Sequence, residues 1–275
     1  MTELVRAVVL GALQALTEFL PISSSGHLIL ASRTLGGSVD TLTFDVGLHV
    51  GTAVAVLAYF WRDWRDIVRS ALAGIRDCGL RVARWEGRAQ MGVWILLGTV
   101  PAVLAGLIFT EWIEQDLRDP AVVGVTLVAG GILLGAADRW GGTLRGLSEM
   151  RGGPALLVGV AQASALIPGV SRSGITIAAA RSLGFERHAA TRFSFMLSMP
   201  IVVAAGLYRL ASALRGEEQV EWGPLALGAC AAFVVGAAVI RFLLGFVQGH
   251  SLLPFVLYRL ALGMVVLGLV ARGAL

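Results

Sequence analysis

The stretch QALTEFLPISSSGH, residues Gln14–His27, places a carboxylate, three serine hydroxyls and an imidazole inside an otherwise apolar run. A charged side chain at the centre of a bilayer costs roughly 2.5–3.5 kcal/mol on insertion scales, so Glu18 is expected to face a wet cavity lined by protein. Pro21 removes a backbone donor and clashes with the preceding turn, which ends any single spanning helix. The serines that follow can cap a new helix. We therefore predict a helix, a turn at membrane depth and a second helix, which is tolerated only where protein or a water-filled cavity surrounds the turn.

A second stretch, QASALIPGVSRSGIT at Gln162–Thr176, repeats this pattern. The matched pairs are Gly11 with Gly159, Gln14 with Gln162, Pro21 with Pro168 within one residue, Ser23 with Ser171, Ser25 with Ser173, and Gly26 with Gly174. Apolar segments interrupted by Gly and Pro at corresponding positions of two halves indicate a central binding site in an inverted-repeat membrane protein. The first copy contributes an acid and a histidine, and the second contributes an arginine.

The composition indicates that the whole chain belongs in a membrane. Of its 275 residues, 56% are hydrophobic and 15% are charged, and the mean hydropathy is +0.79. A soluble domain is far less apolar. All 22 basic residues are arginines. Their concentration in loops is what orientation in a membrane requires, so the net charge of +4 does not indicate nucleic-acid binding. Cys78 lies in a charged loop and Cys230 in an apolar segment, so no disulfide, redox or metal role is expected.

The apolar segments predict an all-α polytopic membrane protein of one domain, 1–275, with six transmembrane helices and two re-entrant helical hairpins. A span needs about 20 residues, so the short segments pair into hairpins instead. These short segments are 4–20 with 26–35, and 154–167 with 173–184. Full spans are expected at 42–60, 91–110, 120–137, 193–211, 224–244 and 253–271. Each half then crosses the membrane three times, an odd number, so inverted repeat 2 (about 150–275) is predicted to be upside down relative to inverted repeat 1 (about 1–140).

Arginine-rich loops set the predicted orientation. Residues 61–90 hold seven arginines, and 139–151 and 181–192 hold three each. The positive-inside rule places these three loops in the cytoplasm, and the more acidic connection at 111–119 falls outside. Both termini and the mouth of the first hairpin are then outside. The second hairpin enters from the cytoplasm, so the two turns can meet near the midplane.

The polar residues of the first stretch admit a structural and a functional interpretation. Glu18 is favoured as functional because of its cost in lipid. Gln14, one helical turn earlier, can orient Glu18 or contact a ligand. Ser23–Ser25 exceed what one helix cap needs, and the N–H groups at a helix start favour an anion. His27 is equally consistent with a core imidazole and with an acid or base that activates a nearby hydroxyl.

Arg172, at the start of the second helix of its hairpin, is either an interface anchor or a phosphate ligand. Its planar fork matches phosphate oxygens, and the helix start adds backbone donors. Thr176 lies three residues after Ser173 and would share its helix face. A phosphate ligand explains more of this hairpin than anchoring does. Asp45 and His49, in the first full span, are candidates to face the cavity, although solvated or structural roles are favoured for them.

Together, these side chains favour phosphate chemistry on a lipid. A diphosphate needs cationic or dipolar neutralisation, and hydrolysis of its anhydride needs an activated nucleophile. With a single arginine, a divalent cation held by Glu18 and the phosphates is a reasonable supplement. The alternative is a polyprenyl-lipid flippase or transporter, because inverted repeats with broken helices at the midplane are transporter architecture. A noncatalytic scaffold does not explain two matched polar hairpins.

The motifs EFLPISSSGH at Glu18–His27 and PGVSRSGIT at Pro168–Thr176 resemble the two signature motifs of the undecaprenyl pyrophosphate phosphatases of the bacitracin-resistance type. The likeness continues in RFSFMLSMP at Arg192–Pro200 and PFVLYRLALG at Pro254–Gly263, so it covers nearly the whole chain. The resemblance implies a multi-pass enzyme of the bacterial inner membrane with its active site open toward the periplasm. It would hydrolyse undecaprenyl diphosphate to undecaprenyl phosphate and inorganic phosphate.

This implied reaction recycles the lipid carrier for peptidoglycan synthesis, cell-wall biogenesis and cell shape, and it confers bacitracin resistance. The implied cofactor is a divalent cation, Mg2+ or Ca2+. The partners would be the lipid substrate and membrane lipid, with no nucleic acid, and a homodimer is compatible with the sequence.

The resemblance also implies a role for individual residues. The implied catalytic residues are Glu18, Ser24, His27 and Arg172, with Glu18 also a metal ligand. The implied phosphate ligands are Ser171, Ser173 and Thr176, and Gln14, Ser23, Ser25 and Gly169 complete the predicted substrate-binding set. Gln14 stands where many relatives have a second glutamate, so the metal has one fewer charged ligand, and His49 stands where Gln is expected. The mechanistic hypothesis is that Ser24 attacks the terminal phosphorus while His27 or Glu18 takes its proton. A water activated by Glu18 is the competing nucleophile.

Overall fold

The computed structural model describes residues 3–35, 42–117, 119–142, 144–215 and 221–275. These residues form helices joined by turns, with one isolated β-bridge between Arg145 and Phe185. The α-helices are α1 (Glu3–Phe19), α2 (Ser24–Leu35), α3 (Leu42–Tyr59), α4 (Trp61–Cys78), α5 (Gly87–Asp116), α6 (Pro120–Trp140), α7 (Gly152–Ala163), α8 (Arg172–Ser182), α9 (Arg187–Leu214), α10 (Trp222–Gly249) and α11 (Leu253–Ala271). Three short 3₁₀ helices are η1 (Val82–Arg84), η2 (Leu147–Glu149) and η3 (Ser164–Leu166).

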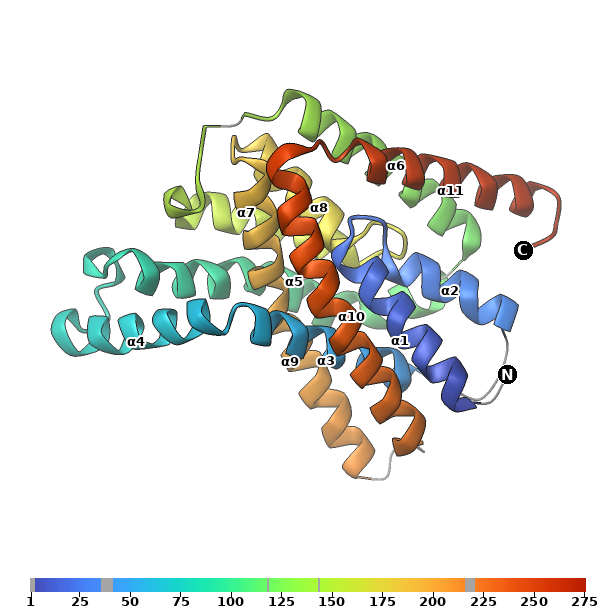
Figure 1. Cartoon of the computed structure of the whole chain (residues 1–275), viewed down its shortest axis with the longest axis horizontal. Helices are drawn as coiled ribbons and strands as arrows, with labels where there is room; N and C mark the ends of the chain where they lie inside the picture. The colour runs from blue at the N-terminus through green and yellow to red at the C-terminus, as the bar shows by residue number, and fades with distance from the viewer. Residues whose placement is uncertain (1–2, 36–41, 118, 143, 216–220) are drawn as a thin grey trace.

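Five helices of the described residues are long and apolar enough to cross a membrane. They are α5, α6, α9, α10 and α11. Each coincides with a predicted span, so the prediction of an all-helical polytopic membrane protein is confirmed. The predicted span at 42–60 coincides with α3, whose apolar part, Gly47–Tyr59, is shorter than the other five. Figure 1 shows both chain ends at the right of the molecule and the turn between α4 and α5 at its left edge.

Two pairs of short helices carry the motif stretches. In the first pair, α1 ends at Phe19 and α2 begins at Ser24, with Pro21 between them. In the second pair, α7 continues into η3, and α8 begins at Arg172 after the Pro168–Gly169 turn. In each pair, a proline prevents the first helix from continuing into the second, because it lacks an N–H and its ring clashes with the preceding helical turn. The predicted helix, turn and helix are thus observed in both stretches.

Each of the two turns ends in a serine with a strained backbone conformation. Ser23 has φ 78° and Ser171 has φ 70°, and they are the non-glycine residues with positive φ in the described parts of the chain. The Ser171 hydroxyl accepts a hydrogen bond from the Gly174 N–H at 3.1 Å, and the Ser23 hydroxyl accepts one from the Gly26 N–H at 3.4 Å. Each serine therefore caps the helix that follows, and it does so in a left-handed conformation that costs about 1–3 kcal/mol.

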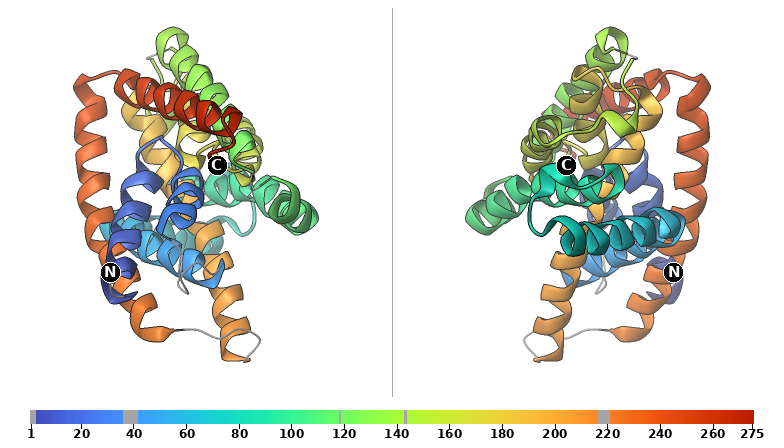
Figure 2. Two further views of the ribbon diagram at one scale, coloured as in Figure 1. Left: turned by 90° about the vertical axis from the view of Figure 1, so that its right-hand side faces the viewer. Right: turned by 90° about the vertical axis from the view of Figure 1, so that its left-hand side faces the viewer.

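Glycines let the short helices approach the long ones closely. A Cβ atom at Gly11 of α1 would overlap the carbonyl of Gly228 in α10, and one at Gly159 of α7 would overlap the carbonyl of Gly98 in α5. Close backbone contact through small residues is a common way for helices to pack in membranes. The first helix of each short pair thus packs against a long helix from the other half of the chain. From the two sides in Figure 2, α6 (green) and α11 (red) lie together at the top, while α10 (orange to red) follows one edge.

Arg181 and Asp138 fix the end of α8 that lies away from its turn. The buried Arg181 guanidinium donates to the carbonyls of Gly142 and Phe185, the latter at 2.6 Å. Asp138, at the end of α6, accepts from Arg187 Nε at 2.6 Å and from the Leu252 N–H at 3.0 Å. These bonds join the ends of α6, α8, α9 and α11. They therefore fix the second short pair at the end of α8 that is opposite its turn.

Candidate active site

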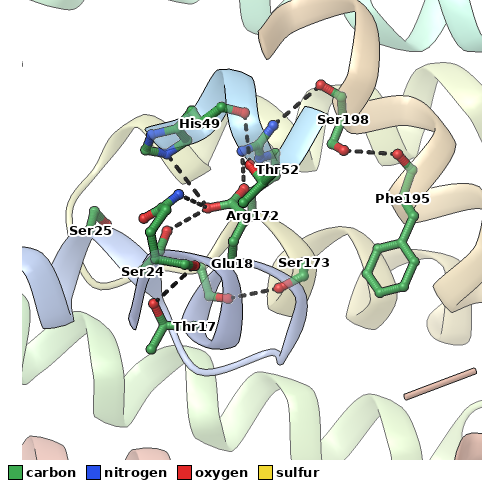
Figure 3. Close-up of polar contacts among 12 residues, drawn as sticks. Thr17, Glu18, Ser24, Ser25, His49, Thr52, Arg172, Ser173, Phe195 and Ser198 are labelled. Atoms are coloured by element: carbon green, nitrogen blue, oxygen red, sulfur yellow. Dashed lines mark hydrogen bonds and ion pairs between the residues drawn. The ribbon is translucent and has the colours of Figure 1, made fainter. Parts of the chain in front are cut away.

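The turns of the two short pairs touch each other. The Ser25 hydroxyl accepts a hydrogen bond from the Gly169 N–H at 3.4 Å, and the Ser173 hydroxyl donates to the Leu20 carbonyl at 3.2 Å. Next to these bonds, the Arg172 guanidinium forms an ion pair with the Glu18 carboxylate (Figure 3). Two stretches separated by about half of the sequence therefore share one polar site.

Glu18 lies at the centre of this site. Its Oε1 atom pairs with Arg172, and its Oε2 atom accepts hydrogen bonds from the Ser24 hydroxyl at 2.6 Å and from Gln14 Nε2 at 3.1 Å. Gln14 reaches Glu18 because both lie on the same face of α1, four residues apart. His49 Nε2, from α3, lies 3.5 Å from the same Oε2 atom. Each of these four side chains can offer the buried carboxylate a hydrogen bond or a positive charge.

Arg172 holds its position through α9. Its Nη1 atom donates to the Ser198 carbonyl at 3.3 Å, while Nη2 faces Glu18. A guanidinium carries five N–H donors in a planar fork, so this side chain can bind further oxygen atoms beside the two it already contacts. Since α8 begins at Arg172, the N–H groups of Arg172 and Ser173 lie at its start, ahead of the Gly174 N–H that bonds to the Ser171 hydroxyl.

His27 is held away from Ser24. Its Nδ1 atom lies 2.6 Å from the Ser23 carbonyl, and its Nε2 atom lies 2.6 Å from the hydroxyl of Tyr258 in α11. The His27 and Tyr258 rings are nearly parallel, with an angle of 9° and centroids 5.6 Å apart. Because a carbonyl only accepts, Nδ1 carries the proton, and the neutral Nε2 accepts from the Tyr258 hydroxyl. Of the two bases considered for Ser24, it is Glu18 that lies within hydrogen-bonding distance of the serine hydroxyl.

The remaining expected substrate ligands divide into two groups. Ser25, Ser173 and Gly169 lie where the two turns touch. Thr176 is fully buried one helical turn further along α8, where its hydroxyl donates to the Arg172 carbonyl at 2.7 Å and lies 2.6 Å from the Ser194 hydroxyl of α9. The structure thus places Thr176 under the site, where it ties α8 to α9.

Gly169 occupies a position that admits no side chain. Its φ is +89°, and a Cβ atom there would overlap the Thr126 hydroxyl and come close to the backbone of Val123 in α6. The Thr126 hydroxyl in turn lies 2.6 Å from the Pro168 carbonyl. This glycine therefore lets the second turn lie directly against α6.

Sequence reasoning missed Arg259, which is fully buried in α11. Its guanidinium donates to five backbone carbonyls. They belong to Pro21 at 3.4 Å, Gly169 at 3.1 Å, Val170 at 2.9 Å, Thr126 at 3.3 Å and Leu127 at 3.3 Å. One arginine thus links both turns to α6. A charge inside the apolar run of α11 was the available signal.

Sequence reasoning also gave His49 too little weight. The sequence favours a solvated or structural role and leaves a place at the cavity as the alternative, and the structure places the His49 ring against the carboxylate at the centre of the site. An ionisable side chain inside an apolar segment, the criterion that selected Glu18, would have selected His49 as well. The side chain of Asp45, considered together with it, lies outside the described residues.

The residues at this site fit a divalent cation that also binds the substrate. Among the described residues, no group of three or more His, Cys, Asp or Glu side chains could hold a metal by itself. Gln14 Oε1, however, is buried and has no hydrogen-bond partner in the described part of the chain, and the same amide group bonds to the Glu18 carboxylate. Mg2+ is commonly bound by one or two protein oxygen ligands together with substrate phosphates. Glu18 and Gln14 could therefore supply the protein's share of such a site.

Residues 7–265 match the family model described as bacitracin resistance protein BacA. The chain belongs to the BacA family. Relatives named undecaprenyl-diphosphatase include a Nocardioides protein that is 44% identical, with 100% of this chain and 99% of the relative covered. One from Desulforudis audaxviator is 45% identical over 94% of this chain and 95% of its own length. One from Kineococcus radiotolerans is also 45% identical, covering 99% and 95%.

The match to the BacA family model includes both motif stretches and the segment that carries Arg259. The similarity to each of these relatives covers nearly the full length of both proteins.

Proposed function

We propose that this member of the BacA family hydrolyses undecaprenyl diphosphate to undecaprenyl phosphate and inorganic phosphate. The observation that carries the proposal is the Glu18 carboxylate, which contacts Arg172 from the second turn and the Ser24 hydroxyl from the first. A nucleophile and a cation suited to phosphate thus lie at two helix starts, with a base beside them at the end of α1. The shared name of the relatives supports the same reaction. Its product is the lipid carrier for cell-wall synthesis, and its activity accounts for the bacitracin resistance in the family's name.

In the proposed reaction, Ser24 is the nucleophile and Glu18 the base. Phosphate oxygens take the place of Glu18 at the Arg172 guanidinium, which frees the carboxylate to accept the Ser24 proton. The bond from Ser24 Oγ to the terminal phosphorus forms as the bridging P–O bond breaks, and undecaprenyl phosphate leaves. Water then cleaves the phosphoserine and releases inorganic phosphate. Arg172 and the N–H groups of the first turn of α8 stabilise the charge on the transferred group.

A divalent cation, Mg2+ or Ca2+, is the proposed cofactor, and Glu18 and Gln14 Oε1 would be the side-chain groups that hold it. When bound, it would neutralise part of the charge on the diphosphate. His27 takes a supporting part in this proposal, because its ring holds the Ser23 carbonyl and thereby the turn that presents Ser24.

The proposed topology has six spans, with α3 as the sixth, and two re-entrant hairpins, α1–α2 and α7–η3–α8. Matched features support two inverted repeats, about 1–140 and about 150–275. The strained serines Ser23 and Ser171 occupy equivalent positions, and so do the packing glycines of α1 and α7. We place the protein in the bacterial inner membrane with the site open toward the periplasm, as the family resemblance implies, and the arginine distribution places the mouth of the first hairpin on that outer side.

Phosphate release by the purified protein in detergent tests the reaction, because no transport can occur without two separate compartments. Brief exposure to substrate labelled in the terminal phosphate tests the nucleophile. Label retained on the wild-type protein and absent from Ser24→Ala would support attack by Ser24. Unlabelled protein together with full turnover by Ser24→Ala would identify water as the nucleophile. A folded wild-type protein that releases no phosphate would refute the proposal and favour the lipid flippase.

A further inference from the structure

Helix α4 and the first turns of α5 form an arm at the left edge of Figure 1. One residue, Phe60, separates α4 from α3. Phe60 is buried and lies under the guanidinium of Arg192 from α9, 5.2 Å from the ring centroid. Arg192 also donates to Asp63 in the first turn of α4 at 2.6 Å. The direction in which α4 leaves the membrane-crossing helices is therefore fixed by contacts.

The arm is a packed element along one face of α4. Ile67 is buried, and a Cβ atom at Gly92 of α5 would press on its side chain. Further along, the indole of Trp85 covers Gly74 and donates to the Gly79 carbonyl at 2.9 Å. One face of α4 is thus covered by α5 and by the connection between them.

The rest of α4 has two neighbouring stripes of different character. Large apolar side chains spaced seven, four and three residues apart form one stripe and are 47–63% exposed: Trp61, Val68, Leu72 and Ile75. Arginines spaced three, four and seven residues apart form the next stripe: Arg62, Arg65, Arg69 and Arg76. At 100° per residue, the arginine stripe lies directly beside the apolar one.

The arm also carries most of the chain's excess positive charge. Residues 61–90 hold seven arginines and four acids, which accounts for +3 of the formal net charge of +4. Arg65 and Arg88 pair with Asp66, and Arg76 pairs with Asp77. Within the described parts of the chain, no acid pairs with Arg62 or Arg69. Positive charge is thus left over beside the apolar stripe.

We propose that α4 lies in the surface layer of the membrane, with its apolar stripe among the acyl chains and its arginines on the phosphates of anionic phospholipids. Three observations combine in this assignment. Four large apolar side chains in a row are not expected on a surface that faces water. Arginine binds phosphate oxygens through two parallel N–H groups. A strongly amphipathic helix with arginine beside Trp, Leu and Ile matches helices that lie in the plane of an interface.

The position of α4 in the chain favours lipid over a protein partner. It begins directly after α3 and packs on α5, so it lies at the ends of membrane-crossing helices, where headgroups are found. A juxtamembrane arginine near an anionic surface gains about 1 kcal/mol, which corresponds to about fivefold in affinity for each residue. The assignment does not depend on the proposed hydrolysis.

Spin labels on the full-length protein in vesicles test the proposal. In a background with Cys78→Ser and Cys230→Ser, labels are placed at Leu72→Cys on the apolar stripe and at Ala73→Cys, the next residue and also exposed. Leu107→Cys, on the exposed surface of α5, is the reference for lipid. In phosphatidylcholine vesicles that contain phosphatidylglycerol, we expect the label at 72 to collide with oxygen and escape a water-soluble nickel complex, as at 107. The label at 73 should collide with nickel.

Two outcomes at position 72 would overturn the proposal. Nickel collisions equal to those at position 73 would place the arm in water. Exclusion of both oxygen and nickel would place the stripe against protein, such as a second copy. The double variant Arg62→Gln/Arg69→Gln tests the arginines, and it should increase the collisions of the label at position 72 with the nickel complex. Removal of phosphatidylglycerol from the vesicles should have the same effect. An unchanged depth in both experiments would refute the role of anionic lipid.

Discussion

Replacing Arg259 with lysine should disable the site without removing a charge. The guanidinium binds five carbonyls at 2.9–3.4 Å in two turns and α6. Lysine has three donors on a single nitrogen and lacks the planar fork, so at least two bonds are lost. At 1.5–3 kcal/mol for a hydrogen bond from a charged group, the loss is roughly 3–6 kcal/mol. If this loss raises the activation free energy by displacing the two turns that hold the substrate, even the lower figure lowers the rate by about a hundredfold.

Phosphate release in detergent measures this effect, with thermal unfolding recorded on the same preparation. Arg241→Lys is the matched control, because this arginine lies exposed on the neighbouring α10 and should tolerate the change. We expect Arg259→Lys to lose at least about a hundredfold in kcat/KM and to unfold at a lower temperature than Arg241→Lys. Wild-type turnover by Arg259→Lys would refute the reasoning, because the turns would then hold their arrangement without the fork.

Two smaller changes test other contacts. Tyr258→Phe keeps the ring on His27 but removes the hydroxyl that binds Nε2, so turnover should fall by about fivefold, near 1 kcal/mol, with little change in unfolding temperature; unchanged turnover would show that this bond is dispensable. Gly159→Ala should lower the unfolding temperature, because its Cβ atom overlaps the Gly98 carbonyl and overpacking costs about 1–3 kcal/mol. Gly153→Ala on the same helix meets nothing within 4 Å and should be tolerated. Equal unfolding temperatures for the two alanine variants would contradict the close packing of α7 on α5.

The helices and the meeting of the two turns could be predicted from sequence because their signals are local. Pro21 and Pro168 end a helix whatever surrounds them. A carboxylate in one apolar run and an arginine in another each need a partner, and the lowest-cost arrangement brings them together. The observed ion pair between Glu18 and Arg172 follows that logic.

The direction of individual side chains could not be predicted in the same way. Ser24 and His27 lie three residues apart on α2, a spacing that suggested a contact between them. Ser24 bonds to Glu18 instead, and His27 bonds to Tyr258, which is 231 residues away in sequence. The hydrogen-bond partner of a side chain depends on which helices from other parts of the chain pack beside it. Nothing in the first stretch indicates that α11 packs there.

The strained serines and Arg259 are connected through the backbone. The left-handed conformations of Ser23 and Ser171 persist only where surrounding contacts hold them, because each costs about 1–3 kcal/mol. Arg259 binds the Pro21 carbonyl, two residues before one serine, and the Val170 carbonyl, directly before the other. The guanidinium that links the two turns therefore also contributes to holding both strained conformations. Because Ser24 and Arg172 come directly after the strained serines, the contacts that assemble the two turns also position the proposed nucleophile and the cation.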